Sequence, residues 1–360
     1  MGNETYVQER SIEEAQQISG MIETLKVGSN ENVLGPSPMA QEAIKEALVD
    51  AHLYPDRHES ILLQKLADDL GAGLSEDNFV SGNGSSDVLR MITQSFIGPG
   101  DRVLIAAPTF NMYEILVRMF GGEPVIVRLQ DFTVDLDAII DALTDDFRLI
   151  FVCNPNNPTG TIVTHGQMAD FLAQIPPGII TVCDEAYMEF ADDRDFPRMT
   201  EFIAQGYDVL VTRTFSKLYG LASLRVGYGF GRVDLMNRVR RRKLKFNSGR
   251  LAYLGAVAAL ADEEHISASL EMVRNGRTFL YQQFDEMGIN YLPTQSNFIF
   301  LTDLPMDANA ICDLAKQQGV ILGPTNPFGL PNNIRITIAR EEENARVVRV
   351  LKEIIEAKTA

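Results

Sequence analysis

The pattern of hydrophobic and polar positions changes character once along this chain. Up to about Arg240, short apolar runs rich in β-branched residues alternate with amphipathic stretches of helical period. This alternation predicts an α/β fold, with a mostly parallel sheet between helices on both of its faces. The expected strands lie near 79 and at 103–106, 125–127, 149–153, 179–183, 209–212 and 226–230. The expected helices lie at 38–48, 59–70, 86–96, 111–120, 136–143 and 165–174.

After Arg240 the pattern becomes mostly helical, with fewer and shorter strands. Helical periodicity covers residues 251–260, 266–287 and 341–357, and short apolar runs at 297–301, 319–322 and 334–338 predict strands. A region of this kind is typical of a smaller α+β domain. We therefore expect a large domain at residues 40–240 and a small domain at 241–360.

Composition and charge narrow the class of protein. The chain has 360 residues, of which 45% are hydrophobic and 22% are charged, as in a globular protein of more than one domain. Its 32 basic and 49 acidic residues give a net charge of −17, which argues against nucleic acid or an anionic membrane as a partner. The basic run at 238–245 is expected to form a helix face near the domain joint.

Targeting and metal-binding patterns do not stand out in the sequence. No apolar stretch follows a basic N-terminal segment, and no apolar run approaches the length that spans a bilayer, so we expect a cytoplasmic protein. Cys153, Cys183 and Cys312 have no paired spacing, and the histidines are scattered. We therefore expect inert thiols and no metal site.

The segment at 213–227, RTFSKLYGLASLRVG, follows an apolar strand and carries the most informative residues. Lys217 is flanked by Thr214 and Ser216, so its amine would lie among hydroxyl groups and could reach the neutral state that covalent chemistry with an aldehyde needs. Arg225 offers a planar guanidinium for a phosphate group. Taken alone, the pair is better explained as a surface lysine and arginine on a loop, and the other segments of the chain change that balance.

Two further strands end in polar side chains at the edge where open α/β sheets bind ligands. Asn157, in FVCNPNNPTG, could aim its amide at a ligand oxygen, although a plain turn also explains this run. Asp184 and Tyr187 follow the apolar run IITVC, where a carboxylate needs a cationic partner or several donors. A protonated pyridine nitrogen would be such a partner, and Tyr187 could donate to a ring oxygen opposite Asn157.

A third run, FVSGNGSSDVLR, leads from a strand through a glycine-rich turn into a helix. Gly84, Ser85 and Ser86 lie where this helix begins, and its free N–H groups and dipole favour an anion. The third glycine of a dinucleotide-binding motif is absent. An ordinary capped helix start is the alternative explanation.

Taken together, these segments resemble fold-type I pyridoxal-phosphate aminotransferases, and within them the histidinol-phosphate aminotransferase group. The resemblance extends from about Asn30 to the last helix and rests on seven ordered blocks. The blocks are Tyr54-Pro55-Asp56, Gly82-Asn83-Gly84-Ser85, Pro108-Thr109-Phe110, Asn156-Asn157-Pro158-Thr159-Gly160, Asp184-Glu185-Ala186-Tyr187, Ser216-Lys217 to Arg225, and Ile334-Arg335-Ile336-Thr337. They specify the fold and cofactor more closely than the substrate.

The resemblance implies that pyridoxal 5'-phosphate is the cofactor. Lys217 would hold it covalently and then move a proton between substrate and cofactor, while Asp184 would pair with the ring nitrogen. Tyr187 and Asn157 would bind the ring oxygen, and Phe110 would stack on the ring. The phosphate would be held by Arg225, Thr214, Ser216 and the helix start at Gly84, Ser85 and Ser86.

The resemblance also implies a homodimer with shared active sites. In such enzymes the residue at Tyr54 reaches the cofactor phosphate of the partner subunit and borders the substrate. Residues 1–39 would form an N-terminal arm that joins the small domain.

Arg335 is the expected substrate anchor, together with Asn157, because a strand-borne arginine among apolar neighbours favours a bidentate anionic partner. By the resemblance, enzymes that bind the phosphate of histidinol phosphate usually carry a second arginine where this chain has Gly323. One arginine matches an α-carboxylate better than a phosphate dianion. We therefore expect histidinol phosphate to be a poor donor unless Arg250 or another cation takes over.

Three functions stay open. The leading one is transamination between an amino donor, either histidinol phosphate or an amino acid such as an aromatic one, and a 2-oxo acid such as 2-oxoglutarate. The second is decarboxylation of an amino acid or its phosphate ester on the same fold. The third is a non-catalytic binding module, which would require a missing lysine or aspartate, whereas Lys217 and Asp184 are both present.

Overall fold

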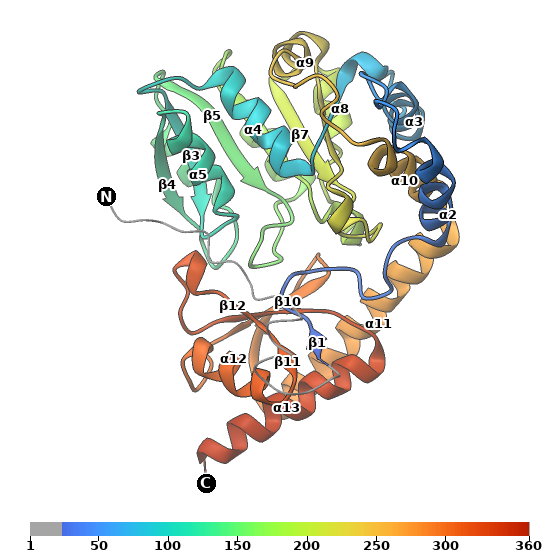
Figure 1. Cartoon of the computed structure of the whole chain (residues 1–360). Helices are drawn as coiled ribbons and strands as arrows, with labels where there is room; N and C mark the ends of the chain where they lie inside the picture. The colour runs from blue at the N-terminus through green and yellow to red at the C-terminus, as the bar shows by residue number, and fades with distance from the viewer. Residues whose placement is uncertain (1–23, 360) are drawn as a thin grey trace.

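The computed structural model describes residues 24–359 of the chain. Within this range, a seven-stranded sheet lies above a smaller four-stranded sheet, and helices surround both (Figure 1). The larger sheet is parallel except at β8, which runs antiparallel to both of its neighbours. Its strands, in spatial order, are β2 (Phe79–Gly82), β8 (Gly227–Gly231), β7 (Val209–Thr214), β6 (Ile180–Asp184), β5 (Phe147–Cys153), β3 (Arg102–Ala107) and β4 (Glu123–Arg128).

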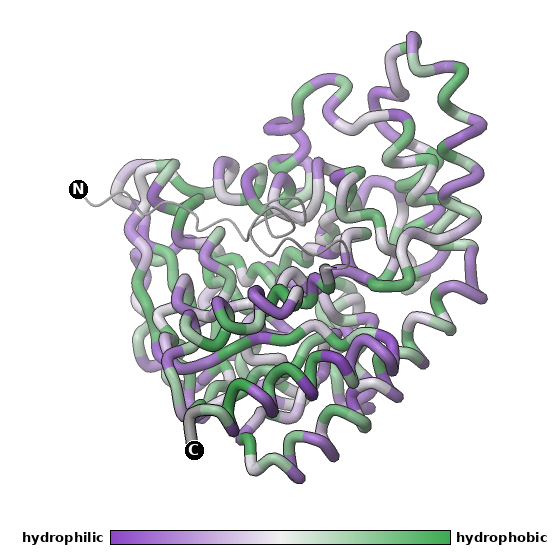
Figure 2. The backbone as a smooth tube through the Cα atoms, turned by 60° about the horizontal axis from the view of Figure 1, so that its bottom comes forward, coloured by the Kyte–Doolittle hydropathy of each residue, from purple (hydrophilic) through white to green (hydrophobic). Residues whose placement is uncertain are grey.

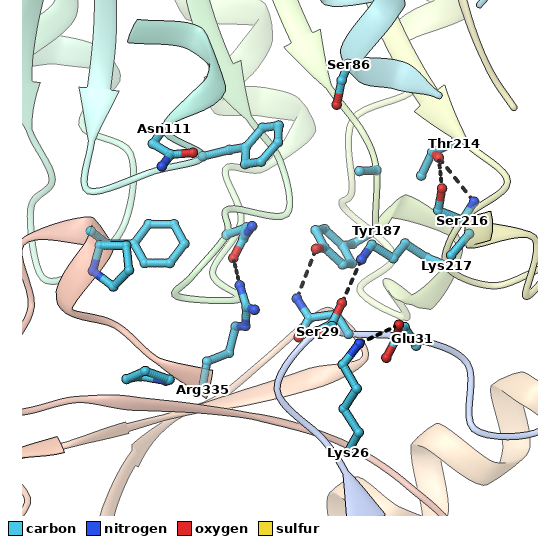
Figure 3. Close-up of a pocket in the computed structure, with 18 of the residues that line it drawn as sticks. Lys26, Ser29, Glu31, Ser86, Asn111, Tyr187, Thr214, Ser216, Lys217 and Arg335 are labelled. Carbon is cyan, nitrogen blue, oxygen red and sulfur yellow. Dashed lines mark hydrogen bonds and ion pairs between the residues drawn. The ribbon is translucent and has the colours of Figure 1, made fainter. Parts of the chain in front are cut away.

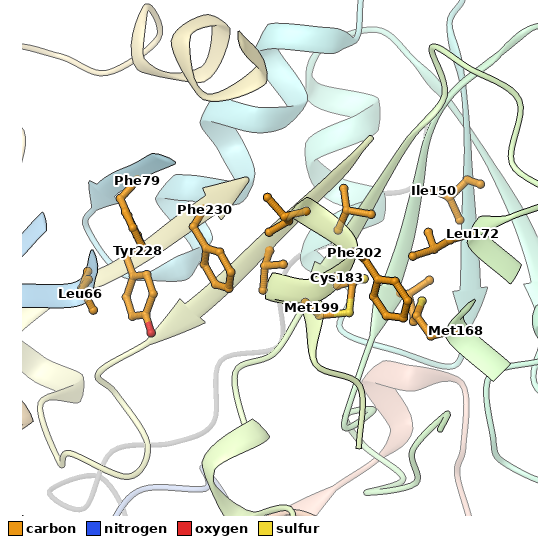
Figure 4. Packing of buried hydrophobic residues seen from close by; sticks show 14 of the residues in the cluster. Leu66, Phe79, Ile150, Met168, Leu172, Cys183, Met199, Phe202, Tyr228 and Phe230 are labelled. Atoms are coloured by element: carbon orange, nitrogen blue, oxygen red, sulfur yellow. The ribbon is translucent and has the colours of Figure 1, made fainter. Parts of the chain in front are cut away.

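The central strands are apolar along their whole length because both faces of this sheet are covered. In β5, Ile150 and Val152 pack on one face, while Leu149 and Phe151 pack on the other. Successive side chains of a strand point to opposite faces, so a strand buried on both sides reads as a continuous hydrophobic run. Figure 4 shows the first of these cores, from Leu66 and Phe79 across to Phe202.

Two groups of helices cover the two faces. The face that carries Ile150 is covered by α3 (Ser60–Leu70), α6 (Leu136–Ala142), α7 (His165–Leu172), α8 (Met199–Ala204) and α10 (Arg250–Leu260). The opposite face is covered by α4 (Ser85–Phe96), α5 (Met112–Met119) and α9 (Val233–Arg240). The helix α2 (Pro38–Ala47) packs on α10, and short 3₁₀ turns lie at η1 (Leu48–Asp50), η2 (Glu76–Asn78), η3 (Met188–Phe190), η4 (Ala222–Leu224) and η5 (Asn326–Phe328).

The second sheet is antiparallel and packs on three helices. Its strands, in spatial order, are β12 (Gly323–Pro324), β13 (Ile334–Thr337), β10 (Phe298–Thr302) and β9 (Asn290–Leu292). The helices are α11 (Glu263–Met287), α12 (Ala308–Gln317) and α13 (Glu341–Thr359). In α11 the buried residues recur every three or four positions, as at Val273, Gly276, Leu280 and Phe284. Figure 2 shows hydrophobic and hydrophilic residues interspersed along the helical turns of the backbone. This pattern gives each helix one apolar face for the core.

A two-stranded parallel pair ties the beginning of the described chain to this second core. The strand β1 (Leu25–Lys26) pairs with β11 (Val320–Ile321). Residues 25–30 therefore lie beside the second sheet before the chain turns away towards α2. Residues 1–23 of the expected N-terminal arm lie outside the described residues, and the domain boundaries at 39 and 240 stay predictions.

The strand expected at 319–322 is present as β11, and a further short strand, β12, follows it in the four-stranded sheet. One local expectation was wrong. The basic run at 238–245 is a helix face only as far as Arg240, where α9 ends, and residues 241–245 form a turn. In residues 24–359, no helix combines the length and the apolar character that crossing a membrane requires.

Candidate active site

A cavity of about 580 Å³ lies between the carboxyl ends of the central strands and the second sheet (Figure 3). It brings together most of the side chains that the sequence singled out. Those that line it are Ser85, Ser86, Phe110, Asn157, Asp184, Tyr187, Thr214, Ser216, Lys217, Arg225 and Arg335. Residues from seven expected strand ends, turns and helix starts thus meet in one place, as the parallel sheet requires.

Asp184 ends β6 with its carboxylate buried at the floor of the cavity, where it is only 2% exposed. Thr212 donates to its Oδ1 at 3.0 Å, and the Tyr113 hydroxyl donates to its Oδ2 at 2.7 Å. Burial raises the pKa of this carboxyl, and the two donors oppose that rise. Among the described residues, no basic side chain forms an ion pair with Asp184. A protonated ring nitrogen fits this site because it supplies the missing positive charge.

Lys217 follows β7 and extends its amine across the cavity. Its Nζ donates to the carbonyl of Ser29 at 3.1 Å and lies 5.4 Å from the centre of the Tyr187 ring. Thr214 and Ser216, which precede it, form a hydroxyl pair at 3.0 Å. The amine and the hydroxyl groups expected to bind a phosphate therefore line one cavity.

The start of α4 and the side chain of Arg225 together form an anion cradle. Arg225 has a left-handed backbone with φ of 54°, and its Nη1 donates to the Ala222 carbonyl at 2.7 Å. Gly84 precedes α4 with φ of 77°, and any side chain there would collide with the Arg225 guanidinium. Glycine is therefore required, and the guanidinium lies beside the free N–H groups of the helix start. This arrangement fits a phosphate group.

Tyr187 and Asn157 are both arranged as donors. Burial raises the pKa of Tyr187 to about 12, so its hydroxyl keeps its proton at neutral pH. Asn30 donates to that hydroxyl at 2.9 Å. The Oδ1 of Asn157 accepts from Arg335 at 2.6 Å, which leaves the amide NH₂ of Asn157 as its remaining polar group.

Arg335 lies on β13 and is 7% exposed. Its Nη2 donates to the Gly28 carbonyl at 2.6 Å, and its guanidinium lies over the ring of Phe328 at 5.9 Å. Gly323, its strand partner, has no space for a side chain, because a Cβ would lie 2.8 Å from the Gly28 carbonyl oxygen. The close contact with the Gly28 backbone therefore excludes an arginine at position 323.

Three predicted residues lie elsewhere. Gly84 lies beneath Arg225 rather than in the cavity lining, and Tyr54 is 80% exposed and stacks on Phe246 at 4.7 Å. Arg250 pairs with Asp50 at 3.0 Å and does not line the cavity, which favours a structural role at its helix start over compensation for the missing arginine. Phe110 lines the cavity and meets Tyr113 edge-on at 5.6 Å, and its stacking on a ring stays a prediction.

Sequence reasoning missed several lining residues. They are chiefly Lys26, Ser29, Asn30 and Glu31 from the N-terminal segment, and Lys316 and Phe328 from the second sheet and its helices. It also missed Tyr113 behind Asp184. Tyr113 follows Phe110 by three residues at the start of a helix, and this spacing was a usable signal.

The chain has many relatives among known proteins. The sequence model of the family described as "Aminotransferase class I and II" matches residues 22–351. A histidinol-phosphate aminotransferase of Moorella thermoacetica is 40% identical over 351 residues, covering 97% of this chain and 90% of that protein. One of Caldicellulosiruptor saccharolyticus is 35% identical over 350 residues, covering 97% of both.

Solved structures agree with these sequence matches. The histidinol-phosphate aminotransferase of Sinorhizobium meliloti, solved in complex with pyridoxal-5'-phosphate, has a TM-score of 0.88 and 28% identity, covering 98% of this chain and 96% of that one. A Thermus thermophilus aspartate aminotransferase mutant, at 19% identity and a TM-score of 0.83, shares the fold over 99% of both chains.

Proposed function

Because this chain belongs to the class I and II aminotransferase family and is an enzyme that uses pyridoxal 5'-phosphate, we propose that it transfers the amino group of histidinol phosphate to a 2-oxo acid such as 2-oxoglutarate. One observation carries the proposal: a single cavity joins Lys217, Asp184 and the anion cradle to Arg335 and two further lysines. The relatives named histidinol-phosphate aminotransferase support this donor. Decarboxylation, the second function considered, is not favoured by any of these matches.

Different residues of the cavity bind the cofactor, stabilise its charge and transfer the proton. When bound, the cofactor supplies an electron-withdrawing ring that makes the substrate's α-hydrogen acidic. Lys217 anchors the cofactor and carries the proton as base and then as acid. Asp184 keeps the ring nitrogen charged, and Tyr187 and Asn157 donate to the ring oxygen. The Arg225 cradle, with Thr214 and Ser216, holds the phosphate.

Two lysines supply the charge that Gly323 leaves out of the substrate site. Lys26 lines the cavity from β1, with its Nζ 2.9 Å from Glu31, and Lys316 lines it from α12. Together with Arg335 they would give a phosphate dianion more than one cationic partner. The missing arginine at 323 therefore does not exclude histidinol phosphate as donor.

We also propose a homodimer in which Tyr54 reaches the partner's cofactor phosphate. Exposed large apolar side chains follow one another at Leu48, Val49, Leu53 and Tyr54. Tyr54 stacks on Phe246, and both Phe246 and the nearby Leu244 are exposed as well. Apolar side chains gathered in this way are typical of a surface that another subunit covers.

Comparing donors in lysine variants tests the substrate assignment. Lys26→Met and Lys316→Met should each lower kcat/KM for histidinol phosphate by roughly tenfold, as expected for a lost charge-assisted contact, and spare tyrosine and phenylalanine. Lys45→Met removes an exposed lysine of α2 and serves as the control. Equal losses for every donor, or a wild-type preference for tyrosine, would remove the support for histidinol phosphate. Release of carbon dioxide would indicate decarboxylation.

A further inference from the structure

Three consecutive residues of the N-terminal segment touch three functional side chains from three different elements. We call residues 28–30 the strap. The Gly28 carbonyl accepts from Arg335 at 2.6 Å, and the Ser29 carbonyl accepts from Lys217 at 3.1 Å. The Asn30 side chain donates to the Tyr187 hydroxyl at 2.9 Å. Figure 3 shows Ser29 beside both Lys217 and Tyr187.

The strap is held rigidly at Asn30. This residue is 1% exposed and has a left-handed backbone, with φ of 57°, a conformation that asparagine tolerates better than most residues. Its N–H donates to Thr337 Oγ1 at 2.9 Å, and its carbonyl accepts from Asn297 at 3.1 Å. Thr337 lies two residues after Arg335 on β13, so the strap moves with the strand that carries the substrate anchor.

The contact between Asn30 and Tyr187 has a chemical consequence. A phenol has one proton to donate, and here an oxygen lone pair of Tyr187 is already occupied by the Asn30 amide. The Tyr187 proton therefore points away from Asn30. A donor to the phenol oxygen also lowers the pKa of Tyr187 relative to burial alone, which makes its hydroxyl a stronger donor.

We propose that Asn30 is a positioning residue, which aims and strengthens the hydrogen bond from Tyr187 to the ring oxygen of the cofactor. The proposal rests on the role given to Tyr187 in the proposed function. The Asn30 side chain is hydrogen-bonded to the Tyr187 hydroxyl and to Thr337 Oγ1. It acts through Tyr187, and its backbone links that tyrosine to β13.

The pH midpoint of the cofactor's visible absorbance tests this role without measuring turnover. A donor to the ring oxygen stabilises negative charge there and lowers this midpoint, so loss of the donor raises it. Tyr187→Phe should raise the midpoint by about 1 to 2 pH units. Asn30→Gly, which keeps the left-handed backbone and removes the amide, should raise it by about half a unit. In the double variant Asn30→Gly/Tyr187→Phe, the midpoint should lie no higher than in Tyr187→Phe alone.

Further variants distinguish the effect of Asn30 on Tyr187 from a general disturbance of the N-terminal segment. Asn30→Asp places an acceptor where the donor was, so the Tyr187 proton turns toward it and the midpoint should rise as far as in Tyr187→Phe. Asn32→Ala removes the hydrogen bonds that hold the chain just after the strap, from the Asn32 amide to the Leu218 carbonyl and the Ser269 hydroxyl, and should leave the midpoint unchanged. An additive shift in the double variant, an equal shift in Asn32→Ala, or no shift in either Asn30 variant would overturn the role of Asn30. No shift in Tyr187→Phe would instead overturn the proposed role of Tyr187 itself.

Discussion

Arg335 and Asn157 are joined by a hydrogen bond of 2.6 Å between Nη1 and Oδ1. It spans the cavity from β13 to the loop after β5. The proposed substrate anchor and the proposed donor to the ring oxygen therefore form one unit, because the amide oxygen bonded to Arg335 fixes the direction of the Asn157 NH₂ group. An anion that binds Arg335 therefore also affects the orientation of the Asn157 amide.

Replacing Asn157 should change the steady-state kinetics in a way that reveals its hydrogen bond with Arg335. Asn157→Ala should lower kcat/KM by at least about tenfold, since a hydrogen bond to a charged group contributes about 1.5–3 kcal/mol. Asn157→Asp should raise KM for every donor still further, because its carboxylate would neutralise Arg335. Steady-state kinetics with two donors measure both effects. A lower KM in Asn157→Asp than in Asn157→Ala would contradict the pairing.

Tyr113→Phe should move the acid limb of the pH profile of kcat/KM to higher pH. The Tyr113 hydroxyl donates to Asp184 and lowers its pKa, against the rise caused by burial. Without this donor the pKa of Asp184 rises, so the ionised form is lost earlier as the pH falls. The expected shift is about one pH unit. Tyr281→Phe is the matched control, because Tyr281 bonds to the backbone of Thr294 instead. A shift toward lower pH would disprove the assigned role.

Much of this site could be predicted from the sequence, because its main residues lie next to strands that the local sequence pattern identifies. The family, the fold class and the cofactor are confirmed. Asp184 and Lys217 each follow an apolar strand, and the carboxyl ends of parallel strands meet at one edge. Continuous hydrophobic runs make such strands easy to recognise.

The strap was not predictable in the same way. Asn30 lies in a polar segment without clear periodicity, and its partner Thr337 is 307 residues away. The pairing of Arg250 with Asp50 is equally non-local. The reason for glycine at 323 is non-local too, since only the structure brings the Gly28 backbone against it.

Gly323→Arg should therefore destabilise the protein instead of completing a phosphate site. Its side chain would have to displace the Gly28 carbonyl, and overpacking of this kind costs about 1–3 kcal/mol in the free energy of unfolding. Thermal or denaturant unfolding measures the loss. Gly166→Ala is the control, because a Cβ there meets open space. If Gly323→Arg were as stable as wild type and used histidinol phosphate better, the steric explanation would be wrong.

Mixed dimers test the shared active site. Tyr54→Phe and Lys217→Ala should each be impaired, and heterodimers of the two should regain activity, because one of their two sites is free of both changes. Subunit exchange is verified first with differently tagged chains. Heterodimers no more active than the parents would show that Tyr54 does not serve the partner's site.

The most direct measurement follows the cofactor's absorbance in a single turnover with histidinol phosphate and no 2-oxo acid. We expect the absorbance of the bound aldehyde form to be replaced by that of the amine form, and 2-oxoglutarate to restore it with release of glutamate. Lys217→Ala should show neither change at a comparable rate. A wild-type enzyme whose absorbance histidinol phosphate leaves unchanged, while tyrosine or phenylalanine converts it, would contradict the proposed function.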